Sequence, residues 1–236
     1  MNYSYNNVSL NGSKDTYTAA KQRYFSRTYG LMSAGLLVTF AAALLSALFL
    51  ANIVFSPVVM TILCIAEFAI VIGFSATLNR ASLQTVRGMF FLYAVVNGMT
   101  LSSIYYAFDL QSITLCFFCA ALAFGVMALF GVRTDRDLSP VRGIFFAGFI
   151  AILILTVVSL FIGYTYTDIL ISVIGIVIFL GVTAYDSQKL GDMFDVAQGS
   201  EVAERYAVYA AMQLYLDFIN LFLYMLRFMS NNKRKN

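Results

Sequence analysis

The chain has 236 residues, of which 61% are hydrophobic and 11% are charged, and its formal net charge is +3. A soluble domain averages about 25% charged residues, so this composition excludes a soluble globular domain and indicates a multi-pass membrane protein. The sequence contains no histidine, which excludes histidine-based catalysis, histidine metal sites and histidine pH sensing. The basic residues mark membrane topology, so we expect membrane lipid around the chain and no nucleic-acid partner.

Two polar tails flank the apolar part of the chain. Residues 1–27 are predicted to form a cytoplasmic N-terminal tail, and residues 230–236 a basic C-terminal tail. No charge occurs from Thr28 to Ala66, which is too long for one crossing and therefore predicts a hairpin of two helices. Ser56 and Pro57 mark the turn, as the N-cap and the first residue of the second helix.

The transmembrane domain, residues 28–229, is predicted to be all-α. Ser139 and Pro140 repeat the capping pattern of the first hairpin, and Gly191 is the expected stop of the sixth helix. The apolar runs between these signals are each long enough to cross a bilayer. We predict seven transmembrane helices, at about 28–51, 57–79, 88–108, 110–132, 140–163, 168–188 and 206–229.

Basic residues test this topology. Eleven of them fall in the N-terminal tail and the even-numbered connectors, whereas the odd-numbered connectors have none. The positive-inside rule therefore places the N-terminus in the cytoplasm. Seven spans leave Arg227 and three C-terminal basic residues outside, and a six-span arrangement with a re-entrant last segment would bring them in. We favour seven spans because the last apolar run is long enough to cross.

The last apolar run, Tyr206 to Met229, carries a carboxylate near its centre. A charge at that depth costs several kcal/mol unless it faces protein, water or an ion. Positions i, i+4, i+7 and i+11 share one helix face, which predicts a polar stripe on the last helix. Its members are Gln213, Asp217, Asn220 and Tyr224. We expect the other six helices to surround this last helix and to enclose an ion pathway.

Two further carboxylates fall inside predicted spans, Glu67 and Asp186. At 1.5 Å per residue, Glu67 and Asp217 both lie roughly 15 Å from the outer face, whereas Asp186 lies closer to the cytoplasmic end. Counting alone therefore leaves open whether Asp217 pairs with Asp186 or lies nearer Glu67. Calcium prefers oxygen ligands, and two close carboxylates titrate as one unit, so such a pair can bind a cation and respond to pH.

Two segments resemble the Bax inhibitor-1 family, the transmembrane Bax-inhibitor-motif proteins. They are Gly181 to Lys189 (GVTAYDSQK) and Leu214 to Phe222 (LYLDFINLF). The resemblance implies seven helices with the last one central, and a pH-sensitive calcium leak. It implies that Asp186 and Asp217 are the paired sensor and transient calcium ligands. It also implies that Glu67 is the acid of the second helix.

The resemblance carries expectations about gating and location as well. A basic residue near the cytoplasmic end of the second helix is expected to pair with the aspartates in the closed state, and Arg80 is the nearest candidate. No cofactor is expected, because calcium and protons are the permeant or sensed ions. The short tails suggest a bacterial member in the inner membrane.

Two other functions remain open. One is a regulatory protein that docks on a membrane protease or another quality-control complex, through the N-terminal tail and the acidic connector 192–204. The other is an intramembrane aspartyl protease that uses Asp186 and Asp217, because two aspartates that share a proton can activate water. The Gly-x-Gly-Asp motif of presenilin-like proteases is absent, since Leu214, Tyr215 and Leu216 precede Asp217. We therefore expect a channel and no enzyme.

Overall fold

The computed structural model describes residues 4–78, 80–162, 165–197 and 201–233. These residues form helices and connecting turns, and no strand occurs among them. The elements are α1 (Ser4–Phe49), α2 (Ala51–Val54), α3 (Pro57–Thr77), α4 (Leu83–Leu101), α5 (Ile104–Ala107), α6 (Leu110–Arg133), the 3-10 turn η1 (Ser139–Val141), α7 (Arg142–Ile162), α8 (Thr165–Val196) and α9 (Glu201–Lys233).

Six helices are long and apolar enough to cross a membrane: α1, α3, α4 with α5, α6, α8 and α9. The prediction of an all-α, multi-pass membrane protein is therefore confirmed. The predicted fifth span corresponds to α7, whose apolar part within the described residues, Arg142–Ile152, is shorter than the others. The count of seven crossings is not confirmed and stays a prediction.

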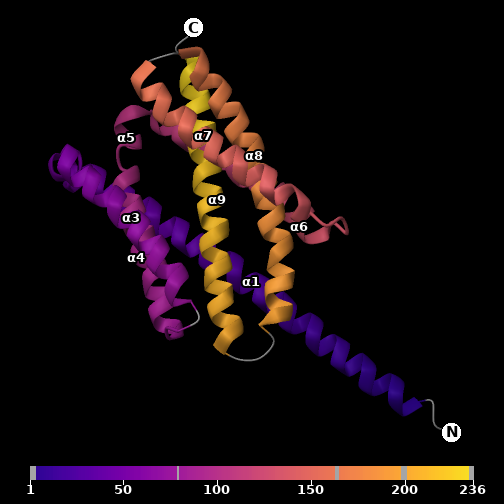
Figure 1. The fold of residues 1–236 in the computed structure, drawn as a ribbon. Helices are drawn as coiled ribbons and strands as arrows, with labels where there is room; N and C mark the ends of the chain where they lie inside the picture. Colours follow the sequence, from indigo (N-terminus) through magenta and orange to yellow (C-terminus); the bar gives the residue numbers. More distant parts are fainter. Residues whose placement is uncertain (1–3, 79, 163–164, 198–200, 234–236) are drawn as a thin grey trace.

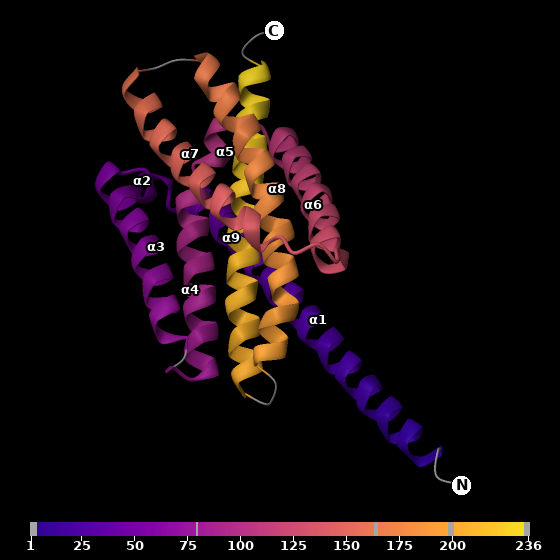
Figure 2. The same ribbon diagram turned by 45° about the vertical axis from the view of Figure 1, so that its right-hand side comes forward.

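Helix α9 is the most buried of the six. The share of its apolar segment buried in the protein is 61%, against 6% for α3. It packs closely on α1, α4, α6 and α8, whereas α3 packs on α4 and α7 packs on α8 (Figures 1 and 2). Four helices thus contact α9 extensively, and the expectation that all six surround it is not confirmed.

Several helix ends differ from the expected ones. Helix α1 already begins at Ser4, inside the predicted tail, and α8 continues past Gly191 to Val196. Tertiary packing explains the longer α8, because Leu190 and Phe194 are buried against Tyr24 of α1 and Ala207 of α9. A glycine inside a helix costs only about 1 kcal/mol, which such burial offsets.

The last helix does not turn back. Helix α9 is one unbroken helix of 33 residues, so it is not the re-entrant segment of the six-span alternative. Near its C-terminal end, Arg227 donates a hydrogen bond to Asp168 of α8. Its charge is therefore compensated by a carboxylate, which explains why this basic residue is tolerated near the end of the last apolar run.

The opposite ends of the helices are tied by ionic contacts. Glu204 of α9 pairs with Arg27 of α1 and, at 3.2 Å, with Arg87 of α4. Gln188 of α8 accepts a hydrogen bond of 2.9 Å from the Leu138 backbone and donates one of 2.8 Å to the Arg136 carbonyl. The Glu204 contacts thus tie α1 and α4 to α9, and the Gln188 contacts tie the α6–α7 connector to α8.

Close contact between α6 and α8 depends on one glycine. A Cβ atom built on Gly131 would lie 2.0 Å from the Ala184 carbonyl oxygen, far inside van der Waals contact. Small residues let membrane helices approach in this way, and here the approach sets the position of the α8 turn that carries Asp186.

We predict that Gly131→Ala lowers the stability of the protein by about 1–3 kcal/mol, the usual range for overpacking. Gly125→Ala on the same helix is the matched control, because nothing lies within 4 Å of a Cβ atom there. Thermal unfolding in detergent should show a lower midpoint for the first variant and an unchanged or higher one for the second. Equal midpoints would contradict the close contact.

Candidate functional site

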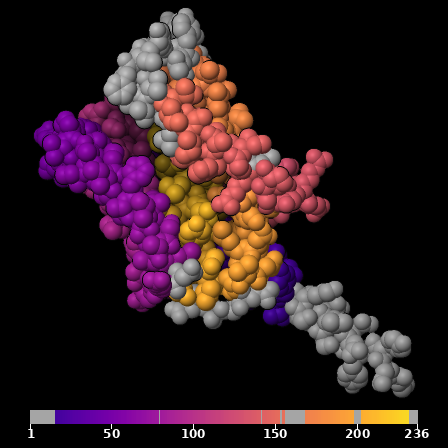
Figure 3. Space-filling model, viewed as in Figure 1, coloured from indigo at the N-terminus to yellow at the C-terminus, as the bar shows by residue number. Residues whose placement is uncertain are grey.

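The three intramembrane acids named above line one cavity of about 530 Å³, the acid cavity. It lies between α3, α4, α7, α8 and α9, and the surface is hollowed between α3 and α7 with side chains of α9 below (Figure 3). Its polar lining residues are Glu67, Tyr93, Arg142, Tyr185, Asp186, Gln213, Asp217 and Asn220. Phenylalanine, valine and leucine side chains form the rest of the wall.

Asp186 of α8 and Asp217 of α9 form a carboxyl pair. Their carboxyl groups are neighbours that act on each other, and the Asp217 side chain is only 5% exposed. A carboxylate has no donor of its own, so the two groups can hydrogen-bond each other only when one of them carries a proton. The second Asp217 oxygen, Oδ2, has no hydrogen-bond partner among the described residues. The structure therefore pairs Asp217 with Asp186, and Glu67 is bonded elsewhere.

The depth count did not predict this pairing, because it took the expected helix end near residue 188 as the membrane boundary. Helix α8 continues ten residues beyond Asp186, so its end does not mark that boundary. The helices α8 and α9 also share the most extensive interface in the described chain, which brings their polar faces together.

Glu67 belongs to a second polar network. Asn97 of α4 donates a hydrogen bond of 3.3 Å to Glu67, and the Thr100 hydroxyl also contacts the carboxylate. The fully buried Tyr215 of α9 donates to Asn97 at 2.9 Å, and its hydroxyl lies 2.6 Å from that of Thr39 in α1. Four helices are thus linked by one chain of hydrogen bonds.

Of this network the sequence predicted only Glu67 as a functional residue, and the other four members were missed: Thr39, Asn97, Thr100 and Tyr215. A signal for them was present in the sequence. Asn97 lies in an apolar run, and a buried amide needs partners on neighbouring helices. Tyr215 carries a hydroxyl into the centre of the last helix and is the residue that meets Asn97 there.

The predicted polar stripe of α9 divides between two environments. Gln213, Asp217 and Asn220 line the acid cavity, and the Asn220 amide donates a hydrogen bond of 2.8 Å to the Leu216 carbonyl. Tyr224 instead stacks on Phe179 of α8, with ring centroids 5.7 Å apart. Phe179 in turn contacts Phe149 of α7 edge-to-face at 5.9 Å, so aromatic rings form the wall of the cavity next to Tyr224.

The expected basic partner, Arg80, does not reach the acids. It is exposed in the turn between α3 and α4, and it does not line the acid cavity. Arg142, the first residue of α7, is the basic residue that lines the acid cavity, and its charge lies near Asp186. The sequence held a signal for Arg142, since a cation at a helix N-terminus opposes the helix dipole and needs another reason to be there.

The cavity offers oxygen atoms to a cation. Calcium takes six to eight oxygen ligands, and no group of three or more acidic, histidine or cysteine residues within the described chain could hold a metal ion. The carboxyl pair and the amide oxygens of Gln213 and Asn220 supply only part of that shell, so water would complete it. This donor set fits a weakly held, passing ion better than a resident one.

Comparison with known proteins gives a family match over most of the chain. Residues 21–234 match the model of the family described as inhibitor of apoptosis-promoting Bax1. The inner membrane protein YbhL of Escherichia coli K12 is 37% identical over 221 residues, which cover 91% of this chain and 94% of YbhL.

Two uncharacterised proteins are similarly related. RP147 of Rickettsia prowazekii is 36% identical over 220 residues, covering 92% of this chain and 93% of that protein. A protein of Borreliella burgdorferi is 36% identical over 217 residues, covering 90% and 94%. The extent of these matches, together with the membrane helices, shows that the chain is a multi-pass bacterial inner membrane protein that belongs to the Bax inhibitor-1 family.

Proposed function

We propose that this protein is a pH-sensitive leak pathway for calcium and similar cations, controlled by the Asp186–Asp217 carboxyl pair. The single observation that carries the proposal is this buried pair, which lies in a cavity of about 530 Å³ with further oxygen donors around it. Negative charge in a membrane interior needs a proton, a counter-ion or a permeant cation to compensate it.

Proton and cation compete for the same oxygens. With the shared proton in place, the pair carries one negative charge and a hydrogen bond can join its oxygens. Loss of that proton leaves two adjacent negative charges, which repel each other unless a cation enters between them. Proton uptake therefore weakens cation binding, and cation binding releases a proton.

Arg142 supports a closed arrangement of this site. Its side chain lines the acid cavity, with the guanidinium 6.0 Å from the centre of the Tyr185 ring, where it competes with a cation for Asp186. The stacked rings of Phe179 and Tyr224 lie farther along α8 and α9, on the side of the Asp168–Arg227 ion pair. We infer that a cation reaches the pair from the Arg142 side and that the aromatic wall must move for it to pass.

The topology that accompanies this proposal has seven crossings with the N-terminus in the cytoplasm. Helix α7 has 21 residues, or about 31 Å at 1.5 Å per residue, which matches the hydrocarbon thickness of a bilayer. The distribution of basic residues supports a cytoplasmic N-terminus, and with it a cytoplasmic position for Arg142.

The first test is calcium flux into proteoliposomes. We expect the double variant Asp186→Asn/Asp217→Asn to lower the flux at least tenfold, which corresponds to about 1.4 kcal/mol, because neither amide can compensate a cation. Its flux should also lose its dependence on pH. Asp135→Asn, in the exposed α6–α7 connector, is the control and should behave as the unmodified protein. Unchanged flux in the double variant would refute the proposal.

A second prediction concerns binding. Calcium affinity should fall as the pH is lowered, because each bound ion must displace the shared proton from the pair. Isothermal titration in two buffers of different ionisation enthalpy measures the number of protons released. About one proton per calcium is expected for a pair that shares one proton. Proton release that persists in the double variant would assign the effect to other groups.

A third prediction concerns Arg142. Arg142→Gln should raise calcium affinity and flux several-fold, since it removes the competing cation beside Asp186. Arg133→Gln is the matched control, because Arg133 ends α6 near the same connector and does not line the acid cavity. If both variants raise flux equally, general surface charge is responsible and Arg142 has no special role.

A docking function finds less support in the structure. The acidic side chains expected to recruit a partner are engaged within the chain: Asp192 with Lys189, Asp195 with Tyr17 and Lys21, and Glu204 with Arg27 and Arg87. Glu201 lies outside the residues whose side chains are described. A membrane-protease partner that binds these acidic side chains would therefore have to displace contacts that they already make within the chain.

The same carboxyl pair would be needed by an intramembrane aspartyl protease, and this alternative can be tested directly. A helical reporter peptide should remain intact in proteoliposomes in which calcium flux is measured. If the peptide is cleaved and the cleavage disappears in Asp186→Asn, the proposed leak function would be replaced by a protease function, since both functions use the same two side chains.

A further inference from the structure

A second large cavity lies on the other side of α9, between α1 and α6. This α1–α6 groove has a volume of about 820 Å³ and an almost entirely apolar lining. It extends along α1 from Phe25 to Phe40, about 22 Å at 1.5 Å per residue, and its floor includes Phe218 of α9. Helices α1 and α6 do not pack closely on each other within the described chain, so the groove separates them.

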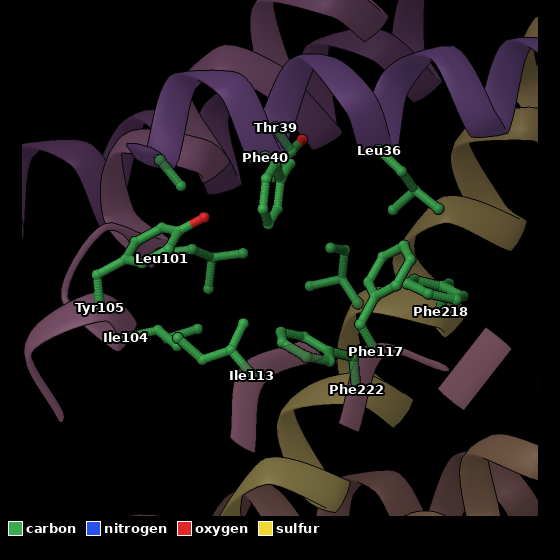
Figure 4. A pocket seen from close by; sticks show the side chains of 12 residues that line it. Leu36, Thr39, Phe40, Leu101, Ile104, Tyr105, Ile113, Phe117, Phe218 and Phe222 are labelled. Atoms are coloured by element: carbon green, nitrogen blue, oxygen red, sulfur yellow. The ribbon is translucent and has the colours of Figure 1, made fainter. Parts of the chain in front are cut away.

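The groove continues into a smaller apolar recess at one end. Leu36, Phe40, Ile113, Phe117 and Phe218 line both spaces, and Figure 4 shows their side chains around the recess of about 50 Å³. At its rim, Leu37 is 71% and Leu129 is 52% exposed. In a bilayer the open side of such a groove faces the acyl chains.

At its other end the groove meets a polar cavity of about 530 Å³, the headgroup cavity. Phe25 and Val132 line both cavities, so the apolar and polar spaces are direct neighbours. The headgroup cavity lies where α1, α6 and α8 leave the apolar region. It is lined by Lys21, Gln22, Asp192 and Asp195, among other polar residues.

Both signs of charge are present in the headgroup cavity. Lys21 lies 3.8 Å from Asp195, and Asp192 is bonded to Lys189 at 2.9 Å. A headgroup that carries only a negative charge would meet two carboxylates there. These side chains keep exposed surface beside their ion pairs, 34% for Lys21, 47% for Asp195 and 62% for Asp192. A headgroup with a phosphate and an ammonium can therefore add to the existing pairs without displacing them, with the phosphate toward Lys21 and Gln22 and the ammonium toward Asp192 and Asp195.

We propose that the α1–α6 groove and the headgroup cavity together bind one zwitterionic aminophospholipid of the surrounding bilayer. One acyl chain lies in the groove and the headgroup lies among the charged residues. The 22 Å length of the groove exceeds the ~15 Å of one hydrocarbon leaflet, so a full acyl chain fits along it. This lipid fills the space between α1 and α6 and supports Phe218, one residue after Asp217. The proposal is independent of ion conduction.

Glycine substitution provides a test that leaves the fold intact. Gly125 lines the groove, and nothing lies within 4 Å of a Cβ atom there, so Gly125→Phe places a ring into the lipid space without displacing protein atoms. Gly88→Phe is the matched control. Gly88 is an exposed residue of α4, nothing lies within 4 Å of a Cβ atom built on it, and it lines neither cavity. Circular dichroism verifies that both variants are folded.

The measurements are native mass spectrometry of co-purified lipid and thermal unfolding with added lipid. Phosphatidylethanolamine should remain bound one per chain and raise the unfolding temperature more than phosphatidylglycerol does. Gly125→Phe should lose both effects at least several-fold, and Gly88→Phe should retain them. Lys21→Gln should reduce the preference for phosphatidylethanolamine while apolar binding persists. Equal stabilisation by both lipids, or equal loss in both glycine variants, would overturn the proposal.

Discussion

The arrangement of this membrane domain depends on one interaction, the contact between the buried carboxyl groups of Asp186 in α8 and Asp217 in α9. Two acidic groups in an apolar interior are tolerated only when proton, cation or hydrogen bond offsets the cost of desolvation. The pair meets this condition by lying on the largest helix–helix interface of the described chain. Gly131 permits it, since it lets α6 press against the α8 turn that precedes Asp186.

The remaining polar groups have partners of their own. Glu67 is held by Asn97 and Thr100, and Tyr215 and Thr39 extend that network through α9 to α1. Beyond the membrane interior, Glu204 binds arginines of two other helices. The Glu67 network and the Glu204 contacts therefore both join α1, α4 and α9, while the carboxyl pair joins α8 and α9. The α1–α6 groove on the far side of α9 is the apolar counterpart of the acid cavity.

Several features of the site could be read from single residues and their spacing. The i, i+4 and i+7 positions place Gln213, Asp217 and Asn220 on one face, and the structure finds all three in the acid cavity. The cation beside the acids could not be predicted in the same way. Arg80 was named because it is the basic residue nearest the cytoplasmic end of the second helix, but the helices bring Arg142, the first residue of α7, to the cavity instead.

The sequence by itself determined that the chain lies in a lipid bilayer and is helical. In lipid, the backbone polar groups of a long run without charges can be satisfied only by hydrogen bonds within the helix. The sequence also determined which acids would need compensation and which face of the last helix carries them. Only the tertiary structure decided that Asp217 meets Asp186 while Glu67 meets Asn97, and that α8 continues past Gly191. These outcomes depend on helix crossings, close approach at glycines and burial against other helices. Such long-range contacts are not encoded in the local periodicity of any one segment.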